Sequence, residues 1–246
     1  MIEAGVDFSD VSFAFTPGQP PLLCNVSLLL EPGTTTALLG RSGSGKTTLM
    51  RMVNALVTPT SGTVRVAGRA TTDWPLLELR RSIGYVIQES GLFPHWTVKR
   101  NVGLALELAG SSDQARNAEV LAMVGLDAAL ATRYPWQLSG GQRQRVGVAR
   151  ALAADPAVLL MDEPFGALDP ITRAEMQTML RDLLARVRKT VLLVTHDLDE
   201  ALYLASRVVF LDHGAVVADL PSDAVLSSQI DYVRRYVAAV HRGARA

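Results

Sequence analysis

The chain has 246 residues, of which 48% are hydrophobic, so it is long enough to bury the core of one large domain. Lys and Arg together number 24 and equal Asp and Glu at 24, so the chain lacks the basic surplus that holds a nucleic-acid backbone by charge alone. The single cysteine, Cys24, excludes an internal disulfide framework and a multi-thiolate metal site. This composition is typical of a reducing compartment such as the cytoplasm.

The N-terminal segment lacks the basic start and apolar core of a secretory signal. No stretch of the sequence reaches the roughly 18 consecutive apolar residues of a membrane-spanning helix. We therefore expect a soluble protein, which could act at a membrane only by docking onto another protein from the aqueous side.

The first predicted elements are strands. Val6–Phe15 and Leu22–Glu31 flank a run rich in Pro and Gly, which favours an antiparallel pair. Thr34–Leu39 is β-branched and then apolar, which indicates a buried strand. A glycine loop and a helical stretch to about Leu56 follow it.

Two short strands are predicted next, at Thr63–Val66 and at Ile83–Ile87 just before Gln88. From Thr97 to about Ala154 the apolar residues recur at helical spacing, which predicts an inserted helical subdomain. Within it, Ser111 and Ser112 are the predicted N-cap of a helix.

The last part of the chain alternates strands and helices. Ala157–Met161 and Thr190–Thr195 are apolar runs of strand length, and Ile171–Arg188 between them is helical, which predicts a parallel sheet covered on both faces. Val208–Leu211 and Ala215–Leu220 predict a hairpin, followed by a short amphipathic tail.

A glycine-rich loop follows the third predicted strand. Gly40, Gly45, Lys46 and Thr47 match G-x-x-x-x-G-K-[ST], which binds phosphate where a strand precedes it and a helix follows. The glycines let backbone N–H groups turn toward phosphate oxygens, and the lysine bridges toward the terminal phosphates. A loop that merely turns a corner is the alternative. The predicted nucleotide-binding residues are Gly40, Arg41, Ser42, Gly43, Ser44, Gly45, Lys46, Thr47 and Thr48.

Two adjacent carboxylates, Asp162 and Glu163, follow the apolar run Val158–Met161 at the sheet edge where open α/β folds bind ligands. Asp162 is placed to hold Mg²⁺, and Glu163 to polarise the water that attacks a terminal phosphate. The alternative is that this pair only caps the following loop. His196 ends the next apolar strand at the same edge and is placed to stabilise phosphate charge, although a lone histidine is more often structural.

The segment Leu138–Arg145, LSGGQRQR, resembles the signature of the ATP-binding cassette (ABC) ATPases. The other motifs of that family are also present, in the order in which the family carries them, along nearly the whole chain. They are the phosphate loop, Gln88 as the glutamine loop, the carboxylate pair, a loop ending at Asp169, and His196 as the switch histidine. Gly166 stands where many relatives have serine.

The resemblance implies a head-to-tail dimer of two copies of the chain, with ATP and Mg²⁺ at the interface. Glu163, His196 and Gln88 are the implied catalytic residues, and Phe15 is expected to stack on adenine from the first strand, where Tyr is commoner. The residues implied to contact ATP from the partner copy are Ser139, Gly140, Gly141, Gln142 and Asp169. The implied metal-binding residues are Thr47, Gln88 and Asp162.

A narrower resemblance covers Arg80–Thr97, which is similar to the segment found in importers of quaternary amines such as glycine betaine, choline or carnitine. In importers this region receives a coupling helix of the membrane subunit. Phe93, His95 and Trp96 are then expected to line a partly exposed groove for that helix, and ordinary packing of an aromatic loop is the alternative. Such relatives often carry a C-terminal regulatory domain, and with the chain ending at Ala246 no such sensing domain is expected.

The expected fold is α/β, a P-loop NTPase (RecA-like) core with a mostly parallel sheet, an antiparallel β subdomain and an inserted helical subdomain. A single nucleotide-binding domain is expected over residues 1–246. About 1–90 and 155–246 would form the core with its antiparallel β subdomain, and about 91–154 the helical subdomain with the signature.

The expected function is ATP hydrolysis coupled to import of a small solute through separate transmembrane permease subunits. An extracytoplasmic substrate-binding protein would be an indirect partner, and the chain would lie in the cytoplasm on the inner face of the plasma membrane. The rival is an ABC ATPase acting on DNA or ribosomes, which usually needs coiled coils, tandem cassettes or basic extensions. No nucleic-acid partner is therefore expected. Importers of polar amino acids, nitrate-type anions or sulfonates share much of the pattern.

Overall fold

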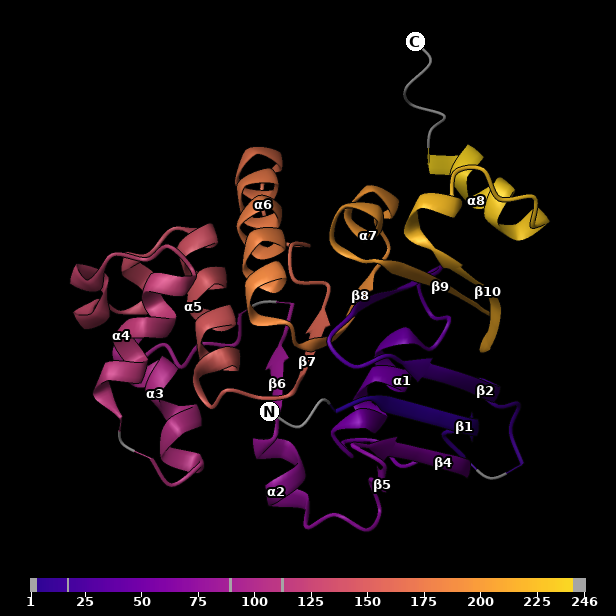
Figure 1. Ribbon diagram of the computed structural model, residues 1–246, viewed down its shortest axis with the longest axis horizontal. Coiled ribbons are helices and arrows are strands. Elements are labelled where there is room, and N and C mark those ends of the chain that lie inside the picture. Colours follow the sequence, from indigo (N-terminus) through magenta and orange to yellow (C-terminus); the bar gives the residue numbers. More distant parts are fainter. Residues whose placement is uncertain (1–3, 17, 89, 112, 241–246) are drawn as a thin grey trace. The chain divides into compact units, whose positions relative to one another are not determined.

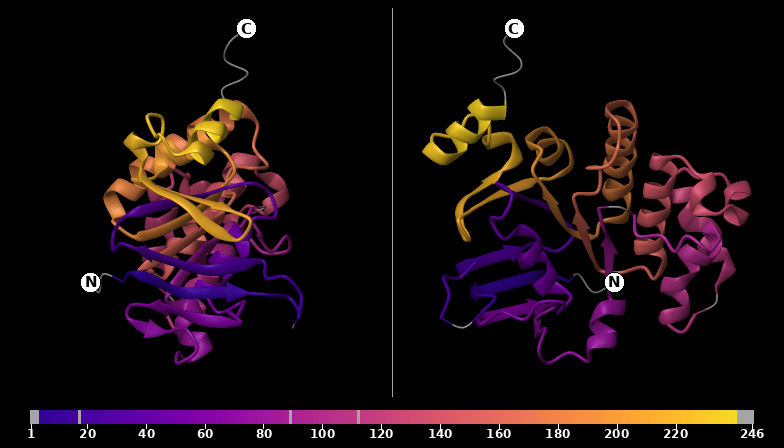
Figure 2. Two further views of the ribbon diagram at one scale, coloured as in Figure 1. Left: turned by 90° about the vertical axis from the view of Figure 1, so that its right-hand side faces the viewer. Right: turned by 180° about the vertical axis from the view of Figure 1, so that it is seen from behind.

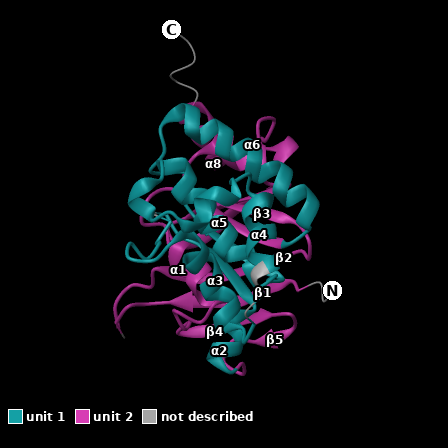
Figure 3. Ribbon diagram, turned by 90° about the vertical axis from the view of Figure 1, so that its left-hand side faces the viewer, with its two compact units in different colours: residues 1–3, 75–189 teal, residues 4–74, 190–246 magenta. Residues whose placement is uncertain are grey.

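The computed structural model describes residues 4–16, 18–88, 90–111 and 113–240. The described residues form two compact units, and each is treated separately below (Figure 3). Unit 1 comprises residues 75–189, and unit 2 comprises the described parts of 4–74 and 190–246. Pro17, Glu89 and Ser112, which belong to segments interpreted above, lie outside the described residues.

Unit 2 contains an antiparallel sheet with the strand order β2-β1-β4-β5. Its strands are β1 (Val6–Phe13), β2 (Leu23–Leu30), β4 (Ser61–Val66) and β5 (Arg69–Ala70). The predicted antiparallel pairing of the first two strands is confirmed. The first strand was predicted to reach Phe15 but ends at Phe13, whose carbonyl accepts the N–H of Leu22 before the chain turns.

The second sheet of unit 2 has the order β10-β9-β3-β8, with β3 parallel to both β8 and β9. Its strands are β3 (Thr35–Leu39), β8 (Thr190–Thr195), β9 (Arg207–Asp212) and β10 (Ala215–Pro221). The predicted hairpin is the antiparallel pair β9–β10, and β8 has the predicted bounds. All six residues of β8 are buried, as expected for a parallel strand covered on both faces.

Three helices pack on this sheet: α1 (Lys46–Val53), α7 (Leu198–Leu204) and α8 (Asp231–Val240). Figure 1 shows α7 and α8 on one side of the sheet and α1 on the other. The helix predicted to reach about Leu56 ends earlier, because Ala55 adopts a left-handed φ of 52° and the N–H of Leu56 turns back to the carbonyl of Arg51. A short 3₁₀ turn, Ser222–Ala224, precedes α8, which is the predicted amphipathic tail.

In unit 1, β6 (Ile83–Val86) and β7 (Val158–Asp162) pair in parallel. The helices are α2 (Leu76–Arg81), α3 (Val98–Leu108), α4 (Gln114–Met123), α5 (Gly140–Ala153) and α6 (Pro170–Val187), with 3₁₀ turns at Ala128–Thr132 and Pro135–Gln137. Figure 2 shows the helices of this unit from a second direction.

The predicted helical periodicity after Thr97 is confirmed. Val98, Val102 and Leu106 of α3 are all buried, as their spacing of four requires. The predicted N-cap of the next helix is wrong, because the cap is Asp113, whose carboxylate accepts the N–H groups of two residues of the first turn of α4.

Within the described residues, every helix is too short or too polar to serve as a transmembrane span.

Candidate nucleotide-hydrolysis site

The phosphate loop of unit 2 runs from the end of β3 to the start of α1. Lys46 is 6% exposed, and its ammonium donates hydrogen bonds of 2.8 Å to the carbonyls of Gly40 and Arg41. A Cβ at Gly40 would lie 2.1 Å from the carbonyl oxygen of Leu211. Gly45 has a φ of 102°, and a Cβ there would lie 2.6 Å from a methyl group of Leu23. Glycine at both positions is therefore required for the loop to curl as it does.

Ser44 provides an independent sign that this loop binds a phosphate. Its side chain is 5% exposed, and its hydroxyl has no hydrogen-bond partner within the described part of the chain. A buried hydroxyl without a partner costs free energy, and a phosphate oxygen bound at this loop would satisfy it. The loop, the buried ammonium of Lys46 and the start of α1 together fit the terminal phosphates of a nucleotide.

His196 lies beside the phosphate loop in the sheet of unit 2. Leu39 and Thr195 are register partners in β3 and β8, so Gly40 and His196 leave neighbouring strands at the same edge. The side chain of His196 is exposed, and its carbonyl accepts a hydrogen bond from Tyr236. Unit 2 therefore brings the predicted switch histidine and the phosphate loop together.

Phe15, the predicted adenine-stacking residue, lies in the turn after β1, because that strand ends at Phe13. Its side chain is 75% exposed and meets the ring of Phe13 edge-on, with 5.1 Å between the ring centroids. One aromatic face is thus accessible, although it is carried by a turn and not by the predicted strand.

In unit 1, the register of β6 and β7 places the carboxylate pair next to the glutamine loop. Val86 pairs with Met161, so the residues that follow each strand emerge at one edge. Asp162 is the last residue of β7 and is 9% exposed, and the hydroxyl of Tyr85 donates to its carboxylate at 3.4 Å.

Gln88 and Glu163 approach one another around Gly166. A Cβ on Gly166 would lie 3.4 Å from the Gln88 amide nitrogen and 3.7 Å from a carboxylate oxygen of Glu163. Both distances are ordinary van der Waals contacts, so the space at Gly166 admits a Cβ. Glu163 itself has a left-handed φ of 44°, a strained conformation for a non-glycine residue that is concentrated at functional sites.

The signature begins helix α5. Ser139 is the N-cap, and its hydroxyl accepts the N–H of Gln142 while the Gln142 side chain accepts the N–H of Ser139. Ser139 is exposed, Gly140 half-buried and Gly141 buried at this helix start, where the helix dipole favours an anion.

Asp169 is the N-cap of α6, where its carboxylate accepts the N–H of Thr172. These hydrogen bonds from Thr172 hold the pKa of Asp169 below its ordinary value. Asp169 therefore stays ionised at neutral pH.

One residue of the site, Tyr85, was not predicted, and neither was the pair of hydrogen bonds between the predicted residues Ser139 and Gln142. Tyr85 alternates with the buried residues of β6, yet nothing in the sequence shows that its hydroxyl reaches Asp162. The capping box of Ser139 and Gln142 could have been found, because S-x-x-Q at a helix start is its usual pattern.

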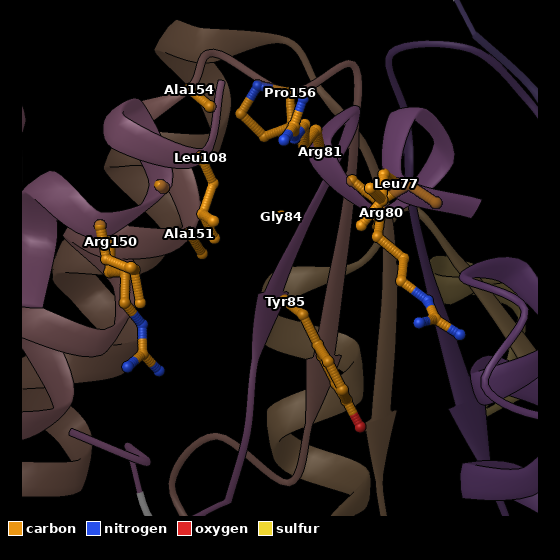
Figure 4. A pocket seen from close by; sticks show the side chains of 13 residues that line it. Leu77, Arg80, Arg81, Gly84, Tyr85, Leu108, Arg150, Ala151, Ala154 and Pro156 are labelled. Atoms are coloured by element: carbon orange, nitrogen blue, oxygen red, sulfur yellow. The ribbon is translucent and has the colours of Figure 1, made fainter. Parts of the chain in front are cut away.

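Unit 1 also carries a pocket of about 330 Å³ that is lined by residues of α2, β6, α3 and α5 (Figure 4). Its walls include the apolar side chains of Leu77, Leu104 and Leu108. Arg80 and Arg150 lie on opposite sides of it (Figure 4). Arg150 donates to the carbonyls of Ser90 and Gly91, so it ties helix α5 to the glutamine loop, and burial lowers the pKa of its guanidinium.

The aromatic residues after the glutamine loop pack on each other. The rings of Phe93 and Trp96 lie 4.3 Å apart, and His95 meets both edge-on. The fully buried Asn101 bonds to three backbone groups of this segment through its amide nitrogen and accepts the N–H of Phe93. The pocket of Figure 4 is thus lined by other residues than the three predicted ones.

A strand that leads through a glycine loop into a helix, with carboxylates at the end of a parallel strand, defines a P-loop nucleotide-hydrolysing protein. A model of the ABC transporter family matches residues 23–166. The chain belongs to this family, and it is an ATP-binding cassette ATPase.

The curated relatives include the glycine betaine uptake system ATP-binding protein YehX of Escherichia coli K12, which is 46% identical over 98% of the chain and 79% of its own length. The choline transport ATP-binding protein OpuBA of Bacillus subtilis is 44% identical over 87% of the chain, which spans 57% of that relative. An Fe(3+) ions import ATP-binding protein of Rhodococcus jostii is 46% identical over 92% of the chain and 64% of its own length.

Among solved structures, the chain is similar to an ATP-binding cassette in a dimeric, post-hydrolysis state bound to ADP and Pi. The two are 35% identical with a TM-score of 0.78, over 88% of this chain and 98% of the other. This likeness confirms the predicted P-loop α/β fold.

Proposed function

We propose that this ATPase drives import of a quaternary amine such as glycine betaine through a separate membrane permease. The support comes from two directions. Relatives named for glycine betaine and choline transport cover most of the chain, and the segment from Arg80 to Thr97 resembles that of such importers. The relative named for Fe(3+) import is 46% identical to the chain, as is the glycine betaine relative, so sequence identity alone does not indicate which solute is transported. The test below therefore compares both solutes.

The proposed catalytic unit is a head-to-tail dimer of two copies. In each half, Lys46 and the phosphate loop bind ATP, and Phe15 stacks on the adenine. The signature of the partner copy, Ser139 to Gln142, meets the terminal phosphate with its helix start, and Asp169 contacts the same nucleotide across the interface.

Hydrolysis is proposed to use the residues at the two sheet edges. The Glu163 carboxylate takes a proton from a water molecule whose oxygen bonds to the terminal phosphorus, while the bond from that phosphorus to the ADP oxygen breaks. Gln88 orients that water, and His196 stabilises the charge on the phosphate oxygens. The products are ADP and inorganic phosphate.

Thr47 of unit 2 and Gln88 and Asp162 of unit 1 carry the kind of oxygen donors that Mg²⁺ takes together with nucleotide phosphates and water. Within the described residues, no three His, Cys, Asp or Glu side chains form a metal site of their own, so the phosphates would have to complete the coordination. When bound, the ion neutralises charge on the nucleotide oxygens.

The pocket of unit 1 is proposed to receive a cytoplasmic helix of the permease. Its apolar walls fit the apolar face of a short helix, and Arg80 and Arg150 at opposite sides fit acidic side chains or the negative C-terminal end of that helix (Figure 4). The cassette would then lie on the inner face of the plasma membrane, and an extracytoplasmic substrate-binding protein would deliver the solute to the permease.

The proposed function is tested by purifying the chain with its membrane complex and measuring ATP turnover. We expect a hydrophobic multispan protein to co-purify, and we expect glycine betaine with its binding protein to raise turnover. Stimulation by Fe³⁺ and not by glycine betaine would contradict the cargo. Salt-sensitive binding of nucleic acid without any membrane partner would contradict the importer.

The docking pocket is tested with Leu108→Arg, because Leu108 lines the pocket and is 51% exposed. The added charge and bulk should abolish co-purification of the permease with little change in the Tm. Leu56→Arg is the matched control, since Leu56 is 52% exposed and belongs to unit 2. Equal retention of the permease by both variants would place the docking site elsewhere.

A further inference from the structure

Helix α8 packs against β9, which pairs with β3, the strand that leads into the phosphate loop. Tyr232 and Tyr236 meet the ring of Phe210 edge-on, with centroids 6.1 and 5.6 Å from it. Phe210 of β9 is fully buried and pairs with Leu39, the last residue of β3 before the phosphate loop. Tyr232 and Tyr236 of α8 therefore pack against the buried cluster that contains both Leu39 and Phe210.

Tyr236 also reaches the switch histidine. Its hydroxyl donates a 3.0 Å hydrogen bond to the carbonyl oxygen of His196, which is 40 residues earlier in the chain. The Thr195 hydroxyl accepts the N–H of Asp197, which belongs to the same peptide group as the His196 carbonyl, and Asp197 caps α7. Both polar atoms of the peptide group that follows the histidine thus have side-chain partners, and the partner supplied from a distant element is Tyr236.

The surroundings of Tyr236 connect it to the phosphate loop as well. Tyr236 and Arg41, the second residue of the loop, line one pocket of about 350 Å³ together with Asp212 of β9. The end of α8 is therefore adjacent to both parts of unit 2 that face the nucleotide.

We infer that Tyr236 is a positioning residue for hydrolysis, because its hydrogen bond to the His196 carbonyl fixes the backbone from which the imidazole projects toward the terminal phosphate. The inference rests on the proposed role of His196. Loss of the bond would let the peptide group after His196 rotate, and the imidazole would then be displaced from the terminal phosphate. Binding of the nucleotide by the phosphate loop would not change.

The hydroxyl stays a donor throughout the physiological pH range. Burial, with Tyr232 and Asp197 nearby, raises the pKa of Tyr236 to about 12. A phenol with a raised pKa is protonated below that value, so the bond to His196 should not titrate between pH 6 and about pH 9.

The test is a double-mutant cycle in the full chain, with ATP hydrolysis measured at saturating and limiting Mg²⁺–ATP. Tyr236→Phe removes the hydroxyl and keeps the ring on Phe210. It should lower kcat about three- to tenfold, the range for loss of one hydrogen bond, with the KM for ATP and the Tm close to wild type. Tyr232→Phe is the matched control, since it removes a phenol hydroxyl from the same face of α8, and its kcat should equal that of wild type.

The cycle is completed by two further variants, the single substitution His196→Ala and the double substitution that combines His196→Ala with Tyr236→Phe. If the tyrosine acts through the histidine, the double variant should have the same kcat as His196→Ala. Multiplied losses, or a wild-type kcat for Tyr236→Phe beside an impaired His196→Ala, would overturn the inference and leave the role of His196 intact. A wild-type kcat for His196→Ala would instead overturn that role, and the inference would fall with it.

Discussion

Lys46 shows how much of the site depends on single side chains. Its ammonium is almost fully buried and bonds to two carbonyl groups of its own loop, so the positive charge is held in place before nucleotide arrives. The residue types of this motif were predictable because each follows from local chemistry: glycines where a Cβ would collide, and a lysine for phosphate charge. The contact of Tyr85 with Asp162 was not predictable, because it depends on how two strands pair.

Lys46→Ala should weaken ATP binding about tenfold or more, because a charge-assisted hydrogen bond contributes roughly 1.5–3 kcal/mol. The dissociation constant for ATP, measured by isothermal titration calorimetry, checks this expectation. Lys99→Ala is the control, since Lys99 is exposed on α3, and it should bind ATP as wild type does. Equal affinities for the two variants would exclude Lys46 from the nucleotide site.

At the scale of elements, the long and strongly patterned segments were predicted and the short ones were missed. The apolar runs of β7 and β8 and the periodic segment that forms α3 were recognised from hydrophobicity alone. Helices α2 and α7, of 6 and 7 residues, are too short to show a clear period. The N-cap Asp197, with Glu200 three residues later, was an available signal for α7.

The packing of β6 on α5 gives a prediction at this scale. A Cβ on Gly84 of β6 would lie 2.4 Å from the carbonyl oxygen of Ala151 and 2.8 Å from a methyl group of Leu159. Because one of these neighbours is backbone, Gly84→Ala must push the strand and helix apart, at a cost of about 1–3 kcal/mol. That loss exceeds the gain of about 0.4–1 kcal/mol from a less flexible unfolded chain.

Urea unfolding measures the effect of Gly84→Ala on the free energy of unfolding. Gly140→Ala is the matched control in the same unit, because a Cβ there meets Leu168 at an ordinary 3.5 Å. We expect the control to be as stable as wild type or slightly more so, since alanine favours a helix. A Gly84→Ala variant of equal stability would contradict the tight packing of β6 on α5.

At the scale of the whole molecule, the chemistry is divided between the two units. The phosphate loop and His196 belong to unit 2, whereas the carboxylates, Gln88 and the signature belong to unit 1. The phosphate loop, the carboxylate pair and His196 were predicted from their own local patterns, whereas Gln88 and the signature were predicted only through the family resemblance, because no periodicity relates Ser139 to Lys46. The proposed dimer explains this division, because each nucleotide would be bound by the phosphate loop of one copy and by the signature of the other.

Glu163→Gln tests this claim most directly. The change removes the proposed base and keeps the shape of the side chain, so the variant should bind ATP without hydrolysing it and accumulate as a closed dimer. Glu175→Gln, the same change at an exposed position on α6, should hydrolyse ATP as wild type does. Analytical ultracentrifugation with Mg²⁺–ATP should give twice the mass of one chain for Glu163→Gln. A strictly monomeric Glu163→Gln, even beside its membrane complex, or turnover at the wild-type rate, would contradict the account.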